Sequence, residues 1–253
     1  TPFDYIRSRR LTEAALALRD GDLRVVDVAL DFVFDSHEGF TRAFSREFGL
    51  PPKRYSQKTP PIQLFMPTGV LEHYRYLQNK GGTTMTEEKK IKTVFVQVIE
   101  RPSRKVLLKR GMKATDYFGY CEEVGCDVWA LLTSVREALY EPIGMWLPQK
   151  LRPADTSEYA QGVEVPQDYA GAIPEGFEII ALEPCKMMIF QGQPYEDAYF
   201  ETAILDLDKA IDSYDPTLYG YQWADETAPR FQLAPEGYRG YIEGRPVQLV
   251  PKT

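Results

Sequence analysis

Residues 24–55, RVVDVALDFVFDSHEGFTRAFSREFGLPPKRY, constrain the fold of this chain more than any other stretch. Apolar residues recur in it twice at the three-to-four-residue spacing of one helix face. The first set is Val25, Val28, Ala29 and Phe32, and the second is Phe40, Ala43, Phe44 and Phe48. Residues 33–36 leave room for one tight turn, in which Asp35 or Ser36 caps the second helix. Gly49 then ends that helix, and Pro51 and Pro52 prevent its continuation. The stretch therefore predicts two short helices joined by a tight turn.

The second helix of this pair has a polar outer face, because Phe40, Phe44 and Phe48 face inward at four-residue steps. Such a helix-turn-helix can place its second helix in a DNA major groove. Residues near the helix start would meet base edges, and basic residues further along would meet phosphates. The residues predicted to contact DNA are His37, Glu38, Thr41, Arg42, Ser45, Arg46, Lys53 and Arg54. The alternative is an ordinary helical hairpin whose charged face is only solvated.

The same stretch resembles the second helix-turn-helix of the AraC family of transcription regulators. The residues that carry the resemblance are Asp27-Val28-Ala29-Leu30, Phe34, Phe40, Arg42, Phe44, Phe48-Gly49, Pro52 and Tyr55. The family usually has glycine where this chain has Val33, and a β-branched residue tolerates positive φ poorly. We therefore expect either a negative φ at Val33 or strain in the turn.

Residues 1–20 are expected to form one amphipathic helix, with Tyr5, Leu11, Ala15 and Leu18 along one side. In the AraC family such a helix joins two helix-turn-helix units, and this sequence does not contain the upstream unit. The sequence does not begin with Met, and we expect it to be a fragment or to lack its first residues. One unit alone should bind DNA weakly, because it makes few phosphate and base contacts.

The net charge of −7 argues against nonspecific nucleic-acid binding by the whole surface. Residues 1–60, however, hold ten Lys and Arg against nine Asp and Glu, so the excess acid lies in the remainder. A near-neutral front joined to an acidic body fits a DNA-binding module that carries an acidic ligand domain. It fits a protein-binding molecule nearly as well.

Composition excludes several other classes of protein. The three cysteines, Cys121, Cys126 and Cys185, do not make a disulfide framework and indicate a reducing cytoplasm. With only two histidines, we expect no metal site and no cofactor. No run of eighteen apolar residues occurs, so no membrane span is expected, and the start lacks the apolar core of a signal peptide.

Proline, glycine and a charged run mark residues 59–91 as a linker. It would join a helix-turn-helix domain at residues 1–58 to a second domain at residues 92–253, and a short helix is possible near residues 69–79. Alternating and helical patterns in the second domain predict strands and helices. The expected strands are 93–100, 104–111, 144–148, 159–165, 177–191 with a break at Pro184, 231–234 and 238–250. The expected helices are 127–140 and 197–214.

The second domain contains an internal repeat with a period of about 82 residues. Pro102 corresponds to Pro184 in this repeat, and Tyr159 corresponds to Tyr241. A duplicated strand–helix–strand–strand unit packs as two sheets, or as one continuous sheet with helices on one face, so the predicted fold class is α+β. The seam between the two units is a natural cleft, because ligand sites favour such interfaces.

Aromatic rings and an acid are candidates to line that cleft. Aromatic walls with a few carboxylates suit a planar or cationic ligand. Tyr241 and Glu243 would share one face of the last strand, because side chains alternate along a strand. The alternatives are that the tyrosines are core or rim residues and that Glu243 is a solvated strand carboxylate.

Residues 93–253 resemble a GyrI-like effector-binding domain, the family that includes the ligand domains of BmrR-type regulators. The resemblance is carried by residues 120–129 (YCEEVGCDVW), 146–148 (WLP), 174–177 (PEGF), 220–223 (GYQW), 240–243 (GYIE) and 246–247 (PV). It implies the two-fold repeat, a pocket at the seam and an acidic residue near the last strand. We assign that acidic role to Glu243 and predict Tyr241, Trp146, Tyr195 and Trp223 as the aromatic walls.

These features together predict a ligand-responsive transcription regulator rather than an enzyme. The expected partners are double-stranded DNA, a small aromatic or cationic effector and, in a homodimer, a second copy of the chain. One alternative is a GyrI-like hydrolase of reactive small molecules that uses Glu243 as a base. Against it, the sequence shows no catalytic triad, metal cluster or phosphate-binding loop. The other alternative is a module that binds and sequesters another protein.

Overall fold

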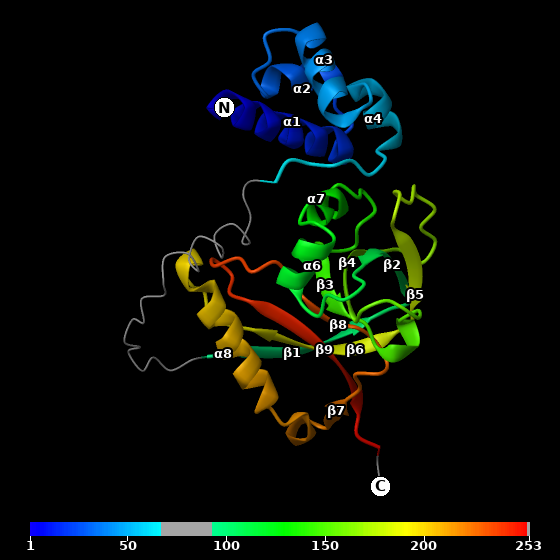
Figure 1. The fold of residues 1–253 in the computed structure, drawn as a ribbon, viewed down its shortest axis with the longest axis vertical. Helices are drawn as coiled ribbons and strands as arrows, with labels where there is room; N and C mark the ends of the chain where they lie inside the picture. The colour runs from blue at the N-terminus through cyan, green and yellow to red at the C-terminus, as the bar shows by residue number, and fades with distance from the viewer. Residues whose placement is uncertain (67–92, 252–253) are drawn as a thin grey trace.

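The computed structural model describes residues 1–66 and 93–251, which form a bundle of four helices followed by a sheet domain (Figure 1). The helix suggested near residues 69–79 and most of the expected linker lie outside the described residues. In the part of the chain that is described, every helix is too short or too polar to span a lipid bilayer. The predicted α+β class is confirmed.

The bundle begins with α1 (Pro2–Asp20), which confirms the single helix expected at residues 1–20. Thr1 and Asp4 form a capping box, in which each side chain accepts a hydrogen bond from the other residue's backbone N–H. The remaining helices are α2 (Val25–Asp31), α3 (His37–Phe48) and α4 (Pro52–Lys58). The sequence analysis did not expect α4. It starts at Pro52, because proline suits the first turn of a helix although it cannot continue one.

The turn between α2 and α3 shows which of the two conformations expected at Val33 occurs. Its φ is +61°, in the left-handed region where a β-branched side chain is strained. The turn is held by a hydrogen bond from the Phe34 N–H to the Ala29 carbonyl. Ser36 caps α3 by accepting from the Gly39 N–H, and Gly49, with φ of +74°, ends it. Strain at Val33, rather than a negative φ, is therefore the outcome.

The second domain is one sheet of nine strands. In chain order they are β1 (Phe95–Arg101), β2 (Arg104–Arg110), β3 (Ile143–Trp146), β4 (Tyr159–Val165), β5 (Glu178–Leu182), β6 (Cys185–Gln191), β7 (Tyr221–Trp223), β8 (Arg230–Gln232) and β9 (Ile242–Leu249). Their order across the sheet is β1-β6-β9-β8-β3-β4-β2-β5, with β7 paired to β9, and all these pairs are antiparallel. The repeat was expected to form either two sheets or one continuous sheet, and the structure has one continuous sheet.

This strand order is that of a duplicated unit. Exchanging β1 with β5, β2 with β6, β3 with β8 and β4 with β9 gives the same order read backwards. The two units therefore meet where β3 pairs with β8, in the middle of the sheet. The seam predicted from the repeat is this β3–β8 junction.

Helices cover one face of each unit. In the first unit α6 (Tyr117–Glu123) and α7 (Val128–Thr133) pack on β4, and in the second α8 (Phe200–Asp212) packs on β6. Alternate residues of β2 and β6 point to opposite faces. Leu107 and Phe190 pack on the helix side, whereas Val106 and Ile189 join a core on the other side. Short 3₁₀ turns at Gln149–Leu151, Asp197–Tyr199 and Pro216–Tyr219 complete the domain.

Two expected elements were wrong in extent. The helix expected at residues 127–140 ends at Thr133, because the Ser134 N–H and hydroxyl both bond back to the Leu131 carbonyl. Beyond it, the Leu139 N–H bonds to the Glu164 carbonyl of β4, so this segment is attached to the sheet. The last strand begins at Ile242 rather than at residue 238, because Gly240 turns the chain with φ of +81°.

Candidate functional site

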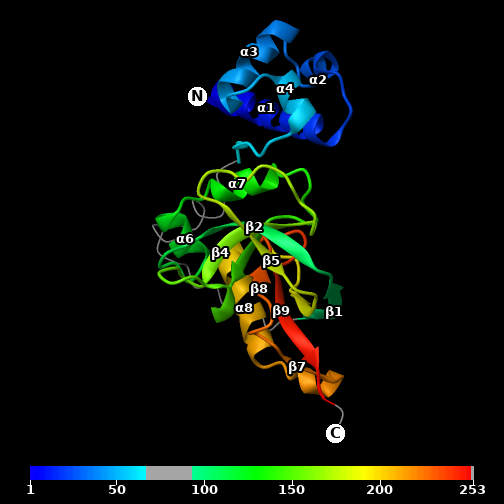
Figure 2. The same ribbon diagram turned by 90° about the vertical axis from the view of Figure 1, so that its right-hand side faces the viewer.

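The polar face of α3 is the first candidate site. Figures 1 and 2 both show α3 at the end of the bundle away from the sheet domain, so the sheet does not cover it. Six of the residues predicted to contact DNA are exposed, and they are His37, Glu38, Arg42, Arg46, Lys53 and Arg54. Lys53 and Arg54 belong to α4 rather than α3. None of the described carboxylates pairs with Arg42 or Arg46, which leaves their charges available.

Thr41 and Ser45, the other two predicted DNA contacts, are half-buried. The Ser45 hydroxyl donates to the Thr41 carbonyl at 2.7 Å, one turn back along α3. A hydroxyl that is already bonded to its own helix must break that bond to donate to a base or phosphate.

A row of aromatic rings packed edge to face holds the inner side of α3 in place. Phe40 and Phe44 are fully buried, and their ring centroids lie 5.5 Å apart. Phe44 contacts Phe48 at 4.7 Å and Tyr55 of α4 at 5.6 Å. Burial raises the pKa of Tyr55 to about 12. Edge-on aromatic packing of this kind fixes the helix, so the orientation of its outer face is set by the core.

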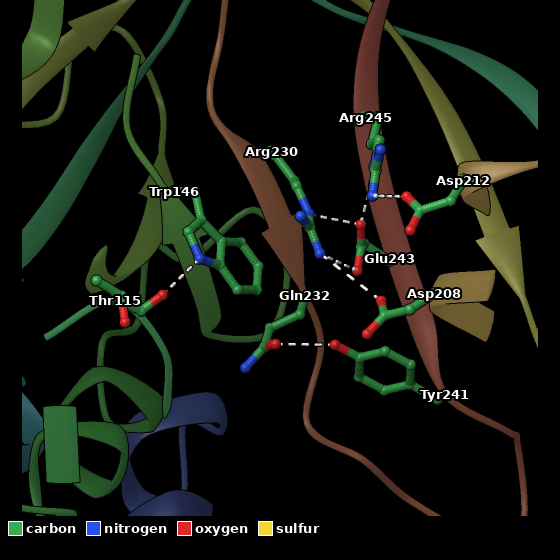
Figure 3. Close-up of polar contacts among 9 residues, drawn as sticks. All are labelled: Thr115, Trp146, Asp208, Asp212, Arg230, Gln232, Tyr241, Glu243 and Arg245. Carbon is green, nitrogen blue, oxygen red and sulfur yellow. Dashed lines mark hydrogen bonds and ion pairs between the residues drawn. The ribbon is translucent and has the colours of Figure 1, made fainter. Parts of the chain in front are cut away.

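The seam between the two repeat units is the second candidate site (Figure 3). Trp146 of β3 lies opposite Arg230 of β8 in the strand register. The Arg230 guanidinium sits over the Trp146 ring, 4.3 Å from the ring centre. On its other side the same guanidinium forms an ion pair with Glu243 at 2.5 Å and a weaker one with Asp208 at 3.7 Å. The seam thus holds a cation between an aromatic ring and two acids, and that cation belongs to the chain.

Glu243 is fully buried and neutralised by two arginines. Its Oε2 accepts from Arg230 at 2.8 Å, and its Oε1 accepts from Arg245 at 3.1 Å. Both carboxylate oxygens are therefore occupied, which leaves Glu243 poorly placed to bind a ligand cation or to act as a base. Burial, and then the charge of Glu243, raises the pKa of Asp208.

Gln232 joins the two units beside this cluster. Its Nε2 donates to the Tyr159 hydroxyl at 3.0 Å, and its Oε1 accepts from the Tyr241 hydroxyl at 2.8 Å. Tyr159 and Tyr241 are the pair that the repeat relates, and both are almost completely buried. Burial raises the pKa of both phenols well above the usual range, so they remain protonated hydrogen-bonding groups.

The predicted effector residues do not all meet. Trp146 and Tyr241 line a hollow of about 160 Å³ at the seam, called here the seam hollow. Glu243 does not line that hollow, because the Arg230 side chain lies between it and Trp146 (Figure 3). Tyr195 is half-buried in the core under α8, and Trp223 packs against Phe190 at 6.2 Å. These two line neither the seam hollow nor the larger pocket described below.

Arg230, Gln232 and Asp208 belong to the seam but were not predicted from the sequence. For Asp208 a signal existed, since it falls on the apolar face of the expected helix, four residues after Ile204 and three before Ile211. For Arg230 and Gln232 no local pattern was available, because their partners come from other strands of the sheet.

A third site lies where the sheet domain meets the bundle, and we call it the junction pocket. Its volume is about 440 Å³. Three segments form it: the extended chain after α4, the region of α6 and α7, and the loop after β8. The lining residues are Gln63, Leu64, Phe65, Met66, Tyr117, Cys126, Asp127, Trp129, Ala130, Gln232, Leu233, Ala234, Pro235 and Glu236. It shares Tyr117, Gln232 and Pro235 with the seam hollow, so the two are neighbours.

Residues 59–66, placed in the linker by the sequence analysis, attach the bundle to α7 (Figure 2). Ile62 and Leu64 are buried in the same core as α1 and Ala130 of α7. The Ile62 N–H donates to the buried Ser134 hydroxyl at 2.9 Å. The Arg19 guanidinium of α1 donates to the Thr133 carbonyl. The two domains are therefore in direct contact, through apolar packing and hydrogen bonds.

Comparisons with known proteins bear on the bundle. Residues 1–58 match the model of a helix-turn-helix domain family. Residues 1–58 are a helix-turn-helix domain of the AraC type. The chain is 40% identical over 68 residues to the right origin-binding protein of Escherichia coli, covering 24% of each protein. It is 37% identical over 65 residues to the probable transcription factor PqrA of Proteus vulgaris, covering 25% of this chain and 53% of PqrA.

The AraC-type domain is thus similar to part of longer regulators. A further relative, the uncharacterized HTH-type transcriptional regulator YbfP of Bacillus subtilis, is 49% identical over 51 residues. That match covers 20% of this chain and 17% of YbfP. The chain spans about a sixth to a half of the length of these relatives.

Solved structures similar in shape include SAV2435 bound to tetraphenylphosphonium and EcmrR in its DNA complex. The first has a TM-score of 0.40 and 14% identity, over 61% of this chain and 94% of that one. The second has a TM-score of 0.37 and 12% identity, over 71% of this chain and 63% of that one. These TM-scores do not assign the sheet domain to a family.

Proposed function

We propose that the protein is a DNA-binding transcription regulator that responds to a small molecule bound by its sheet domain. The observation that carries the proposal is the exposed polar face of α3, held rigid by Phe40 and Phe44 and left uncovered by the sheet domain. The match of residues 1–58 to a helix-turn-helix family supports it.

In this proposal the α3 face divides into two parts. His37, Glu38 and Arg42 lie in the first half of α3 and would contact base edges, together with Thr41 and Ser45 once the Ser45 hydroxyl leaves its own helix. Arg46, Lys53 and Arg54 would bind phosphates, where position matters less than charge.

The effector part of the proposal rests on the interfaces of the sheet domain. Trp146 and Tyr241 offer ring faces or edges at the seam hollow, with Glu243 acting through the arginine it holds. Tyr195 and Trp223, the other predicted wall residues, would then support the core behind the seam. A small aromatic molecule suits such walls.

DNA binding by the full chain tests the proposal. Duplexes enriched from a random-sequence pool would be titrated with the protein by fluorescence anisotropy at several salt concentrations. We expect salt-dependent binding, because phosphate contacts release counterions. Arg42→Ala should cost about 1–3 kcal/mol on an enriched duplex and relax its sequence preference.

Lys53→Ala should weaken binding to all duplexes and lower the salt slope by about one. The matched control is Lys209→Ala, which removes the same charge from the exposed face of α8. If no duplex binds in a salt-dependent way, or if Lys209→Ala has the same effect as Lys53→Ala, the face formed by α3 and α4 is not the DNA-binding surface.

A further inference from the structure

We propose that the junction pocket binds an aromatic cation, and that this ligand contacts both domains at once. The inference rests on the proposed function, in which the sheet domain binds a small molecule, but it places that ligand in the junction pocket instead of the seam hollow. It follows from the contrast between the junction pocket and the seam hollow.

The seam hollow is a poor cation site for two reasons. Its volume of about 160 Å³ is well below the range of roughly 300–1,000 Å³ that holds drug-sized ligands. It also already contains a cation, the Arg230 guanidinium, stacked on Trp146 and paired with Glu243. A ligand cation would have to displace a guanidinium that is tethered to the protein.

The junction pocket differs in size and charge. At about 440 Å³ it falls inside the usual range for ligand sites. Its lining includes two carboxylates, Asp127 and Glu236, and neither a lysine nor an arginine. Two larger surface hollows, of about 610 and 650 Å³, and the seam hollow all have lysine or arginine in their walls. Of these four hollows, the junction pocket alone combines acids with no opposing cation.

The two acids of the junction pocket keep most of their charge available. None of the described cationic side chains forms an ion pair with Asp127. Glu236 is 3.8 Å from the Nε of Arg239, whereas the two terminal guanidinium nitrogens of Arg239 bind Glu141, at 2.5 and 2.7 Å. A ligand cation would therefore meet an acidic rim that the protein neutralises only in part, through the weak pair between Glu236 and Arg239.

Aromatic walls complete the recognition of such a cation. Trp129 and Tyr117 pack edge to face, 6.5 Å apart, and both are half-buried at the pocket. Phe65 enters from the other side, where it contacts Tyr5 of α1 at 5.4 Å. A cation placed against the faces of such rings is attracted by their π-electrons, and more strongly as it loses water.

The same pocket links the ligand to the AraC-type domain. The Phe65 N–H donates to the Thr12 hydroxyl of α1 at 2.9 Å, and the Gln63 side chain donates to the Asp127 carbonyl at 2.8 Å. One wall is thus bonded to α1 and the opposite wall belongs to the sheet domain. A ligand that binds one arrangement of the two walls more tightly than another favours that arrangement. It changes DNA affinity only as far as DNA also distinguishes the two arrangements.

The test uses a matched pair of probes on the full chain, N-methylacridinium and uncharged acridine at alkaline pH, by calorimetry and tryptophan quenching. We expect saturable binding of the cation, about tenfold tighter than of acridine. Trp129→Leu should weaken the cation about tenfold and remove most of the quenching. Trp146→Leu, in the seam hollow, should change its affinity less than about twofold.

Charge variants separate the two sites further. Asp127→Asn should weaken N-methylacridinium about threefold, whereas Asp225→Asn, on an exposed turn away from the pocket, should leave its affinity unchanged. Arg230→Met leaves Glu243 paired with Arg245 alone, and it should likewise leave the affinity of the junction pocket for N-methylacridinium unchanged. Circular dichroism and thermal midpoints would confirm that each variant is folded.

Binding that is lost in Trp146→Leu, or raised in Arg230→Met, would place the cation in the seam and overturn the inference while the proposed function stands. Absence of saturable cation binding to the wild type would also overturn it. Failure of the proposed function itself would appear separately, as loss of salt-dependent DNA binding.

Discussion

The seam hollow and the junction pocket share Tyr117, Gln232 and Pro235, yet they satisfy charge in opposite ways. In the seam, Arg230 fills the space between a ring and two acids, so the protein supplies its own cation. In the junction pocket, rings and acids are present without an opposing lysine or arginine. Rings beside acids therefore indicate a cation site, but only the surroundings show whether the cation comes from the chain or from solution.

The difference has a structural cause. The seam lies inside one sheet, where strand register sets Arg230 opposite Trp146 and Gln232 opposite Glu243. The junction pocket is formed by three segments that share no register, one of them continuous with the AraC-type domain. Contacts within the sheet can be satisfied as the strands pair, whereas those at the junction depend on how two domains meet.

The largest expected difference comes from the same carboxylate-to-amide change at both sites. Glu243→Gln removes the partner of two arginines and should lower the free energy of unfolding by about 3 kcal/mol, at the low end for a buried pair because Arg230 keeps some solvent. Asp127→Asn should change it by less than about 0.5 kcal/mol. Urea titration measures both, and equal losses would show that the seam is no more self-neutralised than the junction.

A smaller effect is expected where the domains meet. Ser134 and Ser213 are both C-caps whose hydroxyls donate back to their helices, but only Ser134 also accepts the Ile62 N–H. Ser134→Ala leaves that buried N–H without its partner and should cost about 1–3 kcal/mol. The control is Ser213→Ala, which removes only the cap. Similar losses in the two variants would mean that the hydrogen bond between the domains contributes little.

The smallest effect concerns Asp208 and the pH dependence of the seam. Burial, and then the charge of Glu243, raises the pKa of Asp208 above 3.8. An acid with a raised folded-state pKa destabilises the fold once ionised, so its contribution to stability falls as pH rises through that pKa. Asp208→Asn should therefore gain stability over the wild type at neutral pH and show no gain below pH 3.8. Urea titrations across this range test the sign, and a loss at neutral pH would mean that pairing with Arg230 outweighs burial.

Sequence patterns anticipated most elements of both domains. The periodicity of Phe40 and Phe44, the Ser36 cap and the Gly49 stop were enough to place α3. The repeat linking Tyr159 to Tyr241 predicted two related units but left open whether they form two sheets or one, and the structure shows one continuous sheet built from both. Predictions of secondary structure failed where long-range contacts overrode local preference. The Leu139 N–H, for example, bonds to the sheet instead of extending a helix.

The candidate sites were harder to predict from the sequence than the fold. The residues proposed to contact DNA could be predicted together, because they lie close to one another in the sequence, between His37 and Arg54. At the seam, Trp146, Tyr241 and Glu243 were chosen, but not the Arg230 that lies between ring and acid. The junction pocket was not anticipated at all, since residues 63–66 read as linker.

The sequence by itself determined the helices of the helix-turn-helix and the repeat of the second domain, because caps, glycine stops and periodicity act over a few residues. Only the tertiary structure decided that arginines pair with Glu243 and that the junction pocket has carboxylates but no lysine or arginine in its lining. Those outcomes depend on strand register and on the contact between domains, which bring together side chains that no local pattern relates.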